Sequence, residues 1–390
     1  MASPSTLIEL RRRIRVGWGL RRIAAHERVG ERTGRRLTTF SRRWAIARAT
    51  RRVAPLQHSE GMPERSFRRY ARGGSAVRIA RLLDLVPPRS RIVDIGIGHG
   101  YVAGVLLRDL RPEHYCGVEL RRKFVDHTRA VLAANELDDR AAELVVGDIF
   151  ELDERFWRDQ DPDFVLLLEV LEHLDDPGAA LRAVAGALRP PTRLLLTVPL
   201  NRRLERVWGH RSIFDRRRLE RLCAEAGLVI ERAEPVQSTW SLILATPGGA
   251  PVASSPAEPD PAYTFTPARV ADETGVIEGA ARVEVANPRV IRLDVGLEPA
   301  GAVRRLRIEG RDGAGHLRLE WAGAPAPGRR ATYVLRPGER AGSLAAIHDG
   351  DPEEVTSINV VAEPRPGTDV AVAVNRAAYV GRGPASRASS

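Results

Sequence analysis

RIVDIGIGHG, residues 91–100, is the stretch that decides the fold of this chain. Its first half is an apolar run of the length of a buried strand, and a helical pattern, YVAGVLLRDL, begins directly after it. Between the two, Gly96, Gly98 and Gly100 let the backbone pass close to a ligand because glycine has no Cβ. Their GxGxG spacing differs from the GxGxxG fingerprint of dinucleotide-binding proteins. Alone, the loop is equally compatible with a tight turn that binds nothing.

The sequence around this loop alternates between short apolar runs and longer helical patterns. After residues 91–96 we expect strands at residues 114–120, 142–148, 163–170, 193–199, 228–236 and 239–246, with helices between most of them. Continuous apolar strands in such an alternation indicate an α/β domain, with a mostly parallel sheet covered by helices on both faces. Ligands of such sheets bind beyond the carboxyl ends of the strands, so the residues there are the candidates for a site.

Three acidic residues stand at the ends of successive expected strands. Asp94 precedes the first glycine by two positions, Glu119 ends the second strand and Asp148 ends the third. An acid placed like Glu119 can accept hydrogen bonds from both ribose hydroxyls of an adenosine, and Asp148 is placed to meet the adenine amino group. One acid alone is most often a solvated strand end. Three in this order indicate an adenosine-containing ligand.

With these motifs, and with LLLEVLEHLDDP after the fourth strand, residues 75–246 resemble the class I (Rossmann-like) S-adenosylmethionine-dependent methyltransferases. The loop departs from the family at Ile97, where a small residue or a cysteine is common. The resemblance implies that the glycines lie near the methionine part of the cofactor, that Asp94 orients the loop and that Glu119 holds the ribose. Asp148 and the backbone of Ile149 would read the adenine. The implied cofactor contacts are Asp94, Gly96, Gly98, Gly100, Glu119, Asp148, Ile149 and Glu169.

The fourth strand runs into Glu169-Val-Leu-Glu172-His173, and a later loop holds His210. These four residues are the candidates for catalysis. Methyl transfer from a sulfonium is an in-line displacement, so the protein mainly aligns the acceptor and excludes water. In a helix Glu169, Glu172 and His173 would come together, and with His210 they could bind a divalent cation. His173 could instead act as a general base near neutral pH.

The ExxEH pattern with a downstream histidine also resembles two groups of metal-dependent O-methyltransferases. One group acts in the ubiquinone pathway, and the other methylates the 2′-hydroxyl at the 3′ end of small RNAs. EVLEHL occurs as well in family members without a known metal, where these residues help to seat the cofactor and shape the acceptor pocket. We expect this pocket role here, with a metal as the alternative.

Positive charge is concentrated in residues 1–74, which we expect to form a basic helical extension. The first 90 residues contain 22 arginines and 6 acidic residues, a net charge of +16; since the chain carries +11, about −5 remains for residues 91–390. A solvated extension is favoured over a peripheral membrane contact or a nucleic-acid contact. With no secretory signal, no stretch of membrane-spanning length and only two cysteines, a cytoplasmic protein is expected.

The rest of the chain has a different pattern. Residues 247–261, PGGAPVASSPAEPDP, have the composition of a flexible linker. Residues 262–380 contain short runs of alternating polarity separated by Gly, Pro and Asp, which predicts an antiparallel β-sandwich. Its Trp321 and Tyr333 are candidates for sugar stacking, although aromatic residues of a sandwich more often belong to its core. The tail, residues 381–390, is expected to be disordered.

Together these patterns favour an S-adenosylmethionine-dependent methyltransferase that acts on an oxygen, with a nitrogen as the less favoured alternative, of a small molecule or a glycan-linked metabolite. The first alternative is an RNA 2′-O-methyltransferase, motivated by the ExxEH pattern and the basic extension. The second is a non-catalytic scaffold that binds a partner through the sandwich. The glycine spacing disfavours a nicotinamide-dependent dehydrogenase.

Overall fold

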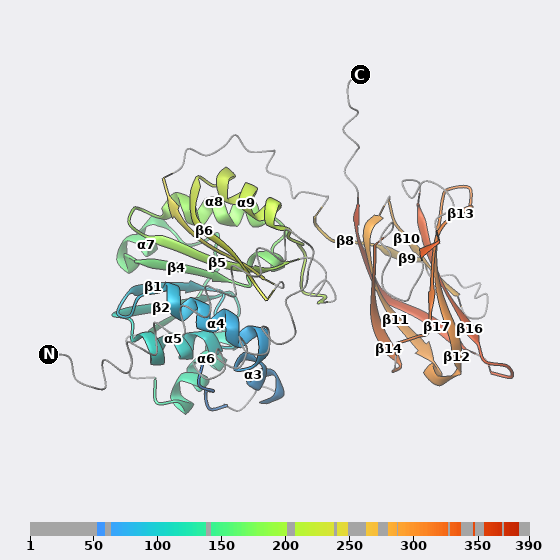
Figure 1. The fold of residues 1–390 in the computed structure, drawn as a ribbon, viewed down its shortest axis with the longest axis horizontal. Helices are drawn as coiled ribbons and strands as arrows, with labels where there is room; N and C mark the ends of the chain where they lie inside the picture. The colour runs from blue at the N-terminus through green and yellow to red at the C-terminus, as the bar shows by residue number, and fades with distance from the viewer. Residues whose placement is uncertain are drawn as a thin grey trace, which may run out of the picture. The chain divides into compact units, whose positions relative to one another are not determined.

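The protein is described by a computed structural model over the following residues: 53–58, 64–137, 142–200, 207–237, 240–248, 263–271, 280–286, 288–326, 328–336, 346–347, 355–368 and 370–381. Most of the expected basic extension, nearly all of the expected linker and residues 382–390 of the expected tail lie outside these ranges. The chain divides into two compact units, Met1–Asn201 with Phe214–Ala257 and Arg202–Ile213 with Glu258–Ser390 (Figure 1). Within the described ranges, no helix is both long and apolar enough to cross a bilayer.

The first unit is built on one seven-stranded sheet with the order β3-β2-β1-β4-β5-β7-β6. Neighbours among the first five strands are parallel, while β7 runs antiparallel to both β5 and β6. The predicted mostly parallel sheet is therefore confirmed. The strands are β1 (Arg91–Ile95), β2 (His114–Glu119), β3 (Ala142–Val146), β4 (Phe164–Leu168), β5 (Arg193–Pro199), β6 (Leu228–Val236) and β7 (Trp240–Pro247).

Helices cover both faces of this sheet, each over its own buried apolar cluster (Figure 1). One face carries α3 (Glu64–Tyr70), α4 (Gly73–Leu85), α5 (Tyr101–Leu110) and α6 (Arg122–Ala134). The other carries α7 (Glu154–Gln160), α8 (Pro177–Ala187) and α9 (Arg216–Glu225), and the short 3₁₀ turn η1 (Leu171–His173) follows β4.

Three of these helices begin at an aspartate whose side chain accepts a hydrogen bond from the first turn. Asp153 caps α7, Asp176 caps α8 and Asp215 caps α9. Aspartate is a preferred N-cap because its carboxylate satisfies a backbone N–H that has no partner within the helix. The local sequence thus determines where these three helices begin.

The second unit contains two antiparallel sheets, confirming the predicted architecture of the C-terminal region. Their strand orders are β15-β13-β12-β16-β10-β9 and β14-β11-β17-β8, and side chains from both sheets share one apolar core. The elements are β8 (Thr266–Pro267), β9 (Arg269–Ala271), β10 (Ala280–Glu284), β11 (Pro288–Glu298), η2 (Ala300–Ala302), β12 (Val303–Arg311), β13 (Leu317–Gly323), β14 (Arg330–Leu335), β15 (Ala346–Ile347), β16 (Ser357–Pro364) and β17 (Ala371–Gly381).

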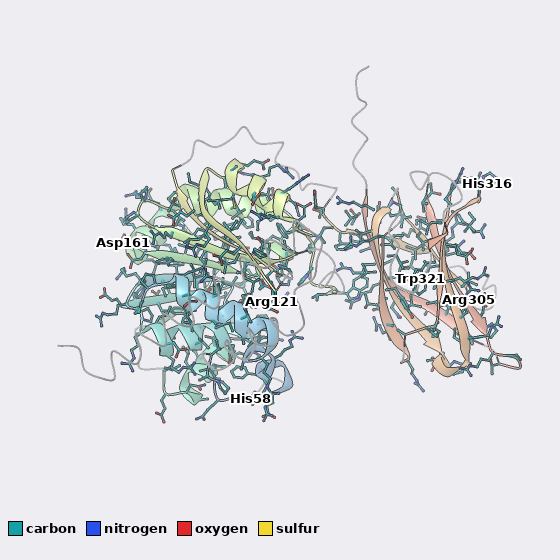
Figure 2. All side chains as sticks on the ribbon, in the orientation of Figure 1. His58, Arg121, Asp161, Arg305, His316 and Trp321 are labelled. Carbon is teal, nitrogen blue, oxygen red and sulfur yellow. The ribbon has the colours of Figure 1, made fainter. Side chains whose placement is uncertain are left out.

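Trp321 and Tyr333 belong to the core of this second unit. Both are buried, and their rings meet edge to face with centroids 5.6 Å apart. Figure 2 labels Trp321 in this unit. A sugar-stacking platform needs an exposed aromatic face. The structure therefore assigns these two residues to packing.

Residues 207–213 are encoded between β5 and α9 but belong to the second unit. Arg292 of β11 is buried and donates hydrogen bonds to the carbonyls of Val207 at 2.8 Å and His210 at 3.3 Å. Its guanidinium lies 4.4 Å from the ring centroid of Trp208 and 4.0 Å from that of Phe265. A charged group with such partners fixes a segment firmly, so residues 207–213 are an integral part of this unit.

Candidate functional site

The glycine loop after β1 has the backbone conformation that the sequence required. Gly96, Gly98 and Gly100 all have positive φ values, of 80°, 54° and 79°. A Cβ on Gly96 would lie 2.5 Å from a methyl of Val170, and one on Gly100 would lie 2.7 Å from the Cα of Thr128. A Cβ on Gly98 would meet no atom within 4 Å. The outer glycines are thus needed for packing, while Gly98 borders open space that a ligand can enter.

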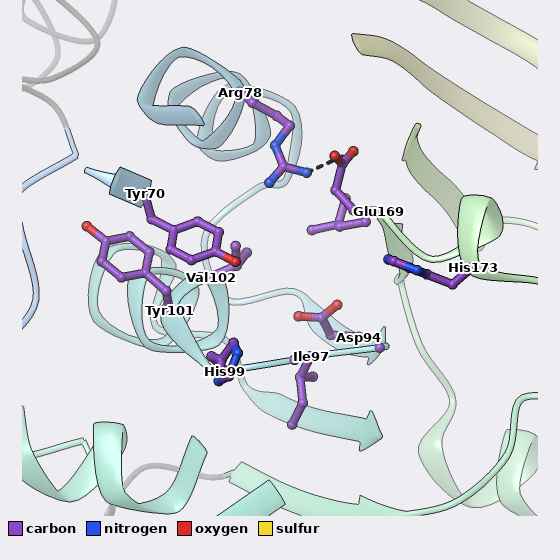
Figure 3. A pocket seen from close by; sticks show the side chains of 12 residues that line it. Tyr70, Arg78, Asp94, Ile97, His99, Tyr101, Val102, Glu169 and His173 are labelled. Atoms are coloured by element: carbon purple, nitrogen blue, oxygen red, sulfur yellow. Dashed lines mark ion pairs between the residues drawn. The ribbon is translucent and has the colours of Figure 1, made fainter. Parts of the chain in front are cut away.

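A cavity of about 210 Å³ lies at the carboxyl ends of β1 and β4 (Figure 3). It brings together the glycine loop, Asp94, Glu169 and His173 from the sequence-predicted set. It also contains residues that the sequence analysis did not single out. Its full lining is Tyr70, Arg78, Asp94, Gly96, Ile97, Gly98, His99, Tyr101, Val102, Leu168, Glu169 and His173.

Asp94 is almost completely buried at the base of this cavity. One of its carboxylate oxygens accepts a hydrogen bond from the hydroxyl of Tyr115 at 2.8 Å. Burial raises the pKa of Asp94 to about 7, the Tyr115 hydroxyl opposes this rise, and the charge of Glu119 adds to it. Asp94 therefore changes charge near neutral pH.

Glu119 is the last residue of β2; it does not itself line the cavity but connects the lining residue Gly98 to a second backbone segment. Its carboxylate accepts hydrogen bonds from the backbone N–H of Gly98 at 3.0 Å and of Arg121 at 3.1 Å. Asp148 lies just beyond the end of β3, where its side chain accepts from the N–H of Phe150 at 3.0 Å. Because β2 and β3 are adjacent and parallel, the two acids occupy the same edge of the sheet.

Two exposed apolar side chains accompany these acids. Leu120 directly follows Glu119 and is 61% exposed, and Phe150 follows Asp148 by two positions and is 52% exposed. Ile149, by contrast, is buried. The signal for the exposed pair was present in the sequence, since each apolar residue closely follows an acid at a strand end. Such surfaces suit the faces of a planar base.

Glu169 stands outside the helical turn in which the sequence analysis placed it. It follows β4 with a φ of 62°, and only Leu171–His173 form a short 3₁₀ turn. Its carboxylate contacts a nitrogen of Arg78 at 3.0 Å and accepts from Thr197 at 3.0 Å and from the indole of Trp240 at 2.6 Å. The expected i, i+3, i+4 stacking with Glu172 and His173 is therefore not what the backbone provides.

Glu172, His173 and His210 differ in their environments. Glu172 is buried, and one of its carboxyl oxygens has no hydrogen-bond partner among the described residues. Burial, followed by the charge of Glu169, raises the pKa of Glu172 well above its ordinary range. His173 is exposed and lines the cavity. His210 belongs to the second unit, where its carbonyl accepts from Arg292. Glu169, Glu172 and His173 thus belong to the first unit and His210 to the second, and the metal stays a prediction.

Aromatic and basic residues complete the cavity wall. The rings of Tyr70 and Tyr101 are stacked with centroids 5.2 Å apart, and Figure 3 shows them side by side at the edge of the cavity. Nδ1 of His99 lies 3.3 Å from Nδ1 of His127. Burial, then the charges of His127 and Lys123, lower the pKa of His99, so its imidazole is neutral at pH 7.

Comparison with known proteins relates part of this chain to methyltransferases. Residues 67–233 match the family model of a methyltransferase domain. No curated protein matches the sequence. Among solved structures, the mitomycin 7-O-methyltransferase is 24% identical over 41% of this chain, with a TM-score of 0.35. The match covers 49% of that enzyme, so this chain spans about half of its length.

For two further solved structures, the match covers a larger share of the other protein. A SAM-dependent methyltransferase from Aquifex aeolicus is 12% identical over 43% of this chain and 88% of its own, with a TM-score of 0.37. The magnesium protoporphyrin IX methyltransferase from Synechocystis PCC 6803 is 16% identical over 45% of this chain and 80% of its own, also with a TM-score of 0.37.

Proposed function

We propose that residues 67–233, which match the family model of a methyltransferase domain, transfer a methyl group from S-adenosylmethionine to a hydroxyl oxygen of a small-molecule or glycan-linked acceptor. The observation that carries the proposal is the cavity at the ends of β1 and β4. It is bordered by the glycine loop on one side and by polar and aromatic side chains on the other. Donor and acceptor groups can therefore meet in one cavity.

The residues around the cavity fit the methyl donor, S-adenosylmethionine. Gly98 borders open space, Glu119 ends its strand at the edge where a ribose would lie, and Leu120 and Phe150 offer exposed apolar faces for an adenine. Asp94 at the base of the cavity suits the positively charged methionine part. When bound, the cofactor supplies an electrophilic methyl group on a sulfonium.

The acceptor side of the cavity is formed by Tyr70, His99, Glu169 and His173. The stacked rings of Tyr70 and Tyr101 provide an apolar wall that excludes water. His173 is the residue we assign to removing the proton from the acceptor hydroxyl, since it lines the cavity and an imidazole nitrogen can act as a general base. Glu169 holds the wall in place through Arg78 and Trp240 rather than acting on the acceptor itself.

The two alternative functions are an RNA 2′-O-methyltransferase and a non-catalytic scaffold. The family match argues against a non-catalytic scaffold, because the domain has the sequence of an enzyme family. Most of the basic extension that motivated the RNA hypothesis lies outside the described residues. The sandwich adds no exposed platform at Trp321 or Tyr333, so the proposal rests on the cavity of the first unit.

Methyl transfer from tritium-labelled S-adenosylmethionine to a panel of acceptors tests the proposal. The panel pairs phenols, aliphatic alcohols and sugars with the matching amines, and includes an RNA oligonucleotide with a free 3′ ribose. We expect label on at least one hydroxyl acceptor and little on its amine partner. His173→Ala should lower the rate while leaving the affinity for S-adenosylhomocysteine unchanged. Label only on amines, or only on RNA, would contradict the proposal.

A further inference from the structure

Tyr115 contacts the cavity only through another residue. It lies in β2, is fully buried, and donates the hydrogen bond of its hydroxyl to Asp94 at 2.8 Å. We propose that Tyr115 is a positioning residue, which holds the Asp94 carboxylate in its anionic form and in the orientation that receives the positively charged part of the cofactor. This inference rests on the proposed function and adds a residue that none of the motifs contains.

The sheet register explains how the hydroxyl reaches the carboxylate. β1 and β2 are parallel, with Ile92 opposite Tyr115 and Asp94 opposite Gly117. Asp94 lies two residues after Ile92 and so projects on the same face as Tyr115, which makes the two side chains diagonal neighbours. Gly117 leaves the position beside Asp94 without a side chain, and the side chains of Leu144 and Ile97 border that position.

The Tyr115 hydroxyl counteracts the surroundings that raise the pKa of Asp94. Burial and the charge of Glu119 both favour the protonated acid, and Tyr115 is the group that opposes them. Burial, together with the charge of Asp94, raises the pKa of Tyr115 well above its ordinary value, so its hydroxyl remains a donor at every working pH. A donor that is never lost stabilises the carboxylate continuously.

Other titratable and charged groups reach the same cavity from different elements, and none replaces this donor. Arg78 of α4 is paired with Glu169, which follows β4, at 3.0 Å. In the glycine loop, the lowered pKa of His99 keeps its imidazole neutral at pH 7. The remaining groups are the hydroxyls of Tyr70 and Tyr101, from α3 and α5, and the imidazole of His173, from η1. Among the described residues, the only hydrogen bond to the Asp94 side chain comes from Tyr115.

Tyr115→Phe keeps the ring and removes only the donor. The buried carboxylate then has no hydrogen bond, so its deprotonation moves to higher pH. The cofactor product S-adenosylhomocysteine carries an ammonium group and should bind best to the anion. For the wild type, affinity should therefore fall as the pH drops through about 7, where Asp94 becomes protonated. For Tyr115→Phe the fall should begin at higher pH, with affinity about tenfold lower than wild type at pH 7 and nearly equal at pH 9.

Calorimetric binding of S-adenosylhomocysteine to the full chain, from pH 6 to pH 9, tests this inference. The variants are Tyr115→Phe, Asp94→Asn and the control Tyr333→Phe. Tyr333 is a buried tyrosine of the second unit, and its hydroxyl accepts a hydrogen bond from the backbone N–H of Ala326 at 2.9 Å. The amino group of the ligand titrates identically for every variant. The ratio of each variant's affinity to that of the wild type therefore reports the protein alone.

We expect a pH-dependent ratio for Tyr115→Phe, a wild-type decline that is absent in Asp94→Asn, and no change for Tyr333→Phe. A Tyr115→Phe ratio that is constant with pH, whether near one or uniformly low, would overturn the inference. Should Tyr115→Phe fail to fold by circular dichroism, a wild-type decline unchanged in Asp94→Asn would overturn it equally. Absence of binding to the wild type at every pH would instead refute the proposed function, so the two failures are distinguishable.

Discussion

The indole nitrogen of Trp240 donates a hydrogen bond to the carboxylate of Glu169 at 2.6 Å. Arg78 and Thr197 hold the other carboxylate oxygen, each at 3.0 Å. Glu169 has a φ of 62°, a conformation that costs a residue with a side chain about 1 kcal/mol or more. Such strain persists where the surroundings determine the conformation, which is common beside ligand sites. Three elements of the first unit, α4, β5 and β7, therefore fix the acceptor side of the cavity through one side chain.

Trp240→Phe tests this network. The substitution leaves one carboxylate oxygen of Glu169 without its donor, and a hydrogen bond to a charged group contributes about 2 kcal/mol. We expect the free energy of unfolding, measured by urea denaturation, to fall by about that amount. The matched control is Trp157→Phe, which loses a bond to the neutral carbonyl of Leu152 and should cost less. Equal losses for the two variants would show that ring packing, not the carboxylate contact, dominates.

Glu172→Gln should change the dependence of stability on pH. The folded protein raises the pKa of Glu172 well above its ordinary value, so the folded state binds this proton more tightly than the unfolded state. Wild-type stability should then decline as the pH rises from about 4.5 toward the raised pKa. Glutamine cannot ionise and removes that decline. Denaturation midpoints at several pH values should show that the stability of the variant increases relative to that of the wild type as the pH rises. A difference in stability that is constant with pH would contradict the raised pKa of Glu172.

Phe150→Ala examines the apolar edge beside Asp148. Because the side chain is 52% exposed, we expect the melting temperature to change little, while the affinity for S-adenosylhomocysteine falls several-fold through loss of contact with the adenine. Val229→Ala is the control, since Val229 is 50% exposed on β6 at the opposite end of the sheet order. If both variants bind equally well, Phe150 takes no part in binding the base.

Arg292→Leu addresses the second unit. Loss of the guanidinium leaves the carbonyls of Val207 and His210 without their donor, so amide hydrogen exchange in residues 207–213 should accelerate, and stability should fall by about 2 kcal/mol. The exposed Arg305 supplies the control, Arg305→Leu, with little effect expected. Affinity for S-adenosylhomocysteine should stay within about twofold, because every proposed cofactor residue lies in the first unit. Unchanged exchange would show that other contacts hold this segment.

Much of the fold could be predicted from the sequence because its signals are local. Continuous apolar strands, the glycine loop and aspartates at helix starts each determine their own neighbourhood, and the observed sheet follows from them. The 3₁₀ turn after β4 was not predictable in the same way. Glu169 is held outside a helix by Arg78 and Trp240, which are distant in sequence, and a local pattern carries no information about them.

Some residues of the candidate site could likewise be predicted from local motifs, and others could not. The glycines and strand-end acids form motifs, so their gathering at one edge of the sheet could be foreseen. Tyr70 and Arg78 come from helices before the first strand and belong to no motif, and Tyr115 reaches Asp94 only through the register of two strands. The membership of residues 207–213 in the second unit depends on Arg292, far along the chain. Such relationships are tertiary, and composition or periodicity does not reveal them.

The central claim is that this cavity binds S-adenosylmethionine, and calorimetry with S-adenosylhomocysteine tests it most directly. Wild type, Glu119→Ala and the control Glu113→Ala should be titrated with this ligand and with NAD; Glu113 is exposed at the opposite end of β2, where it pairs with Arg89. We predict micromolar binding to wild type and Glu113→Ala, strong weakening in Glu119→Ala, and no binding of NAD. Absence of S-adenosylhomocysteine binding, or equal binding by Glu119→Ala, would contradict the account.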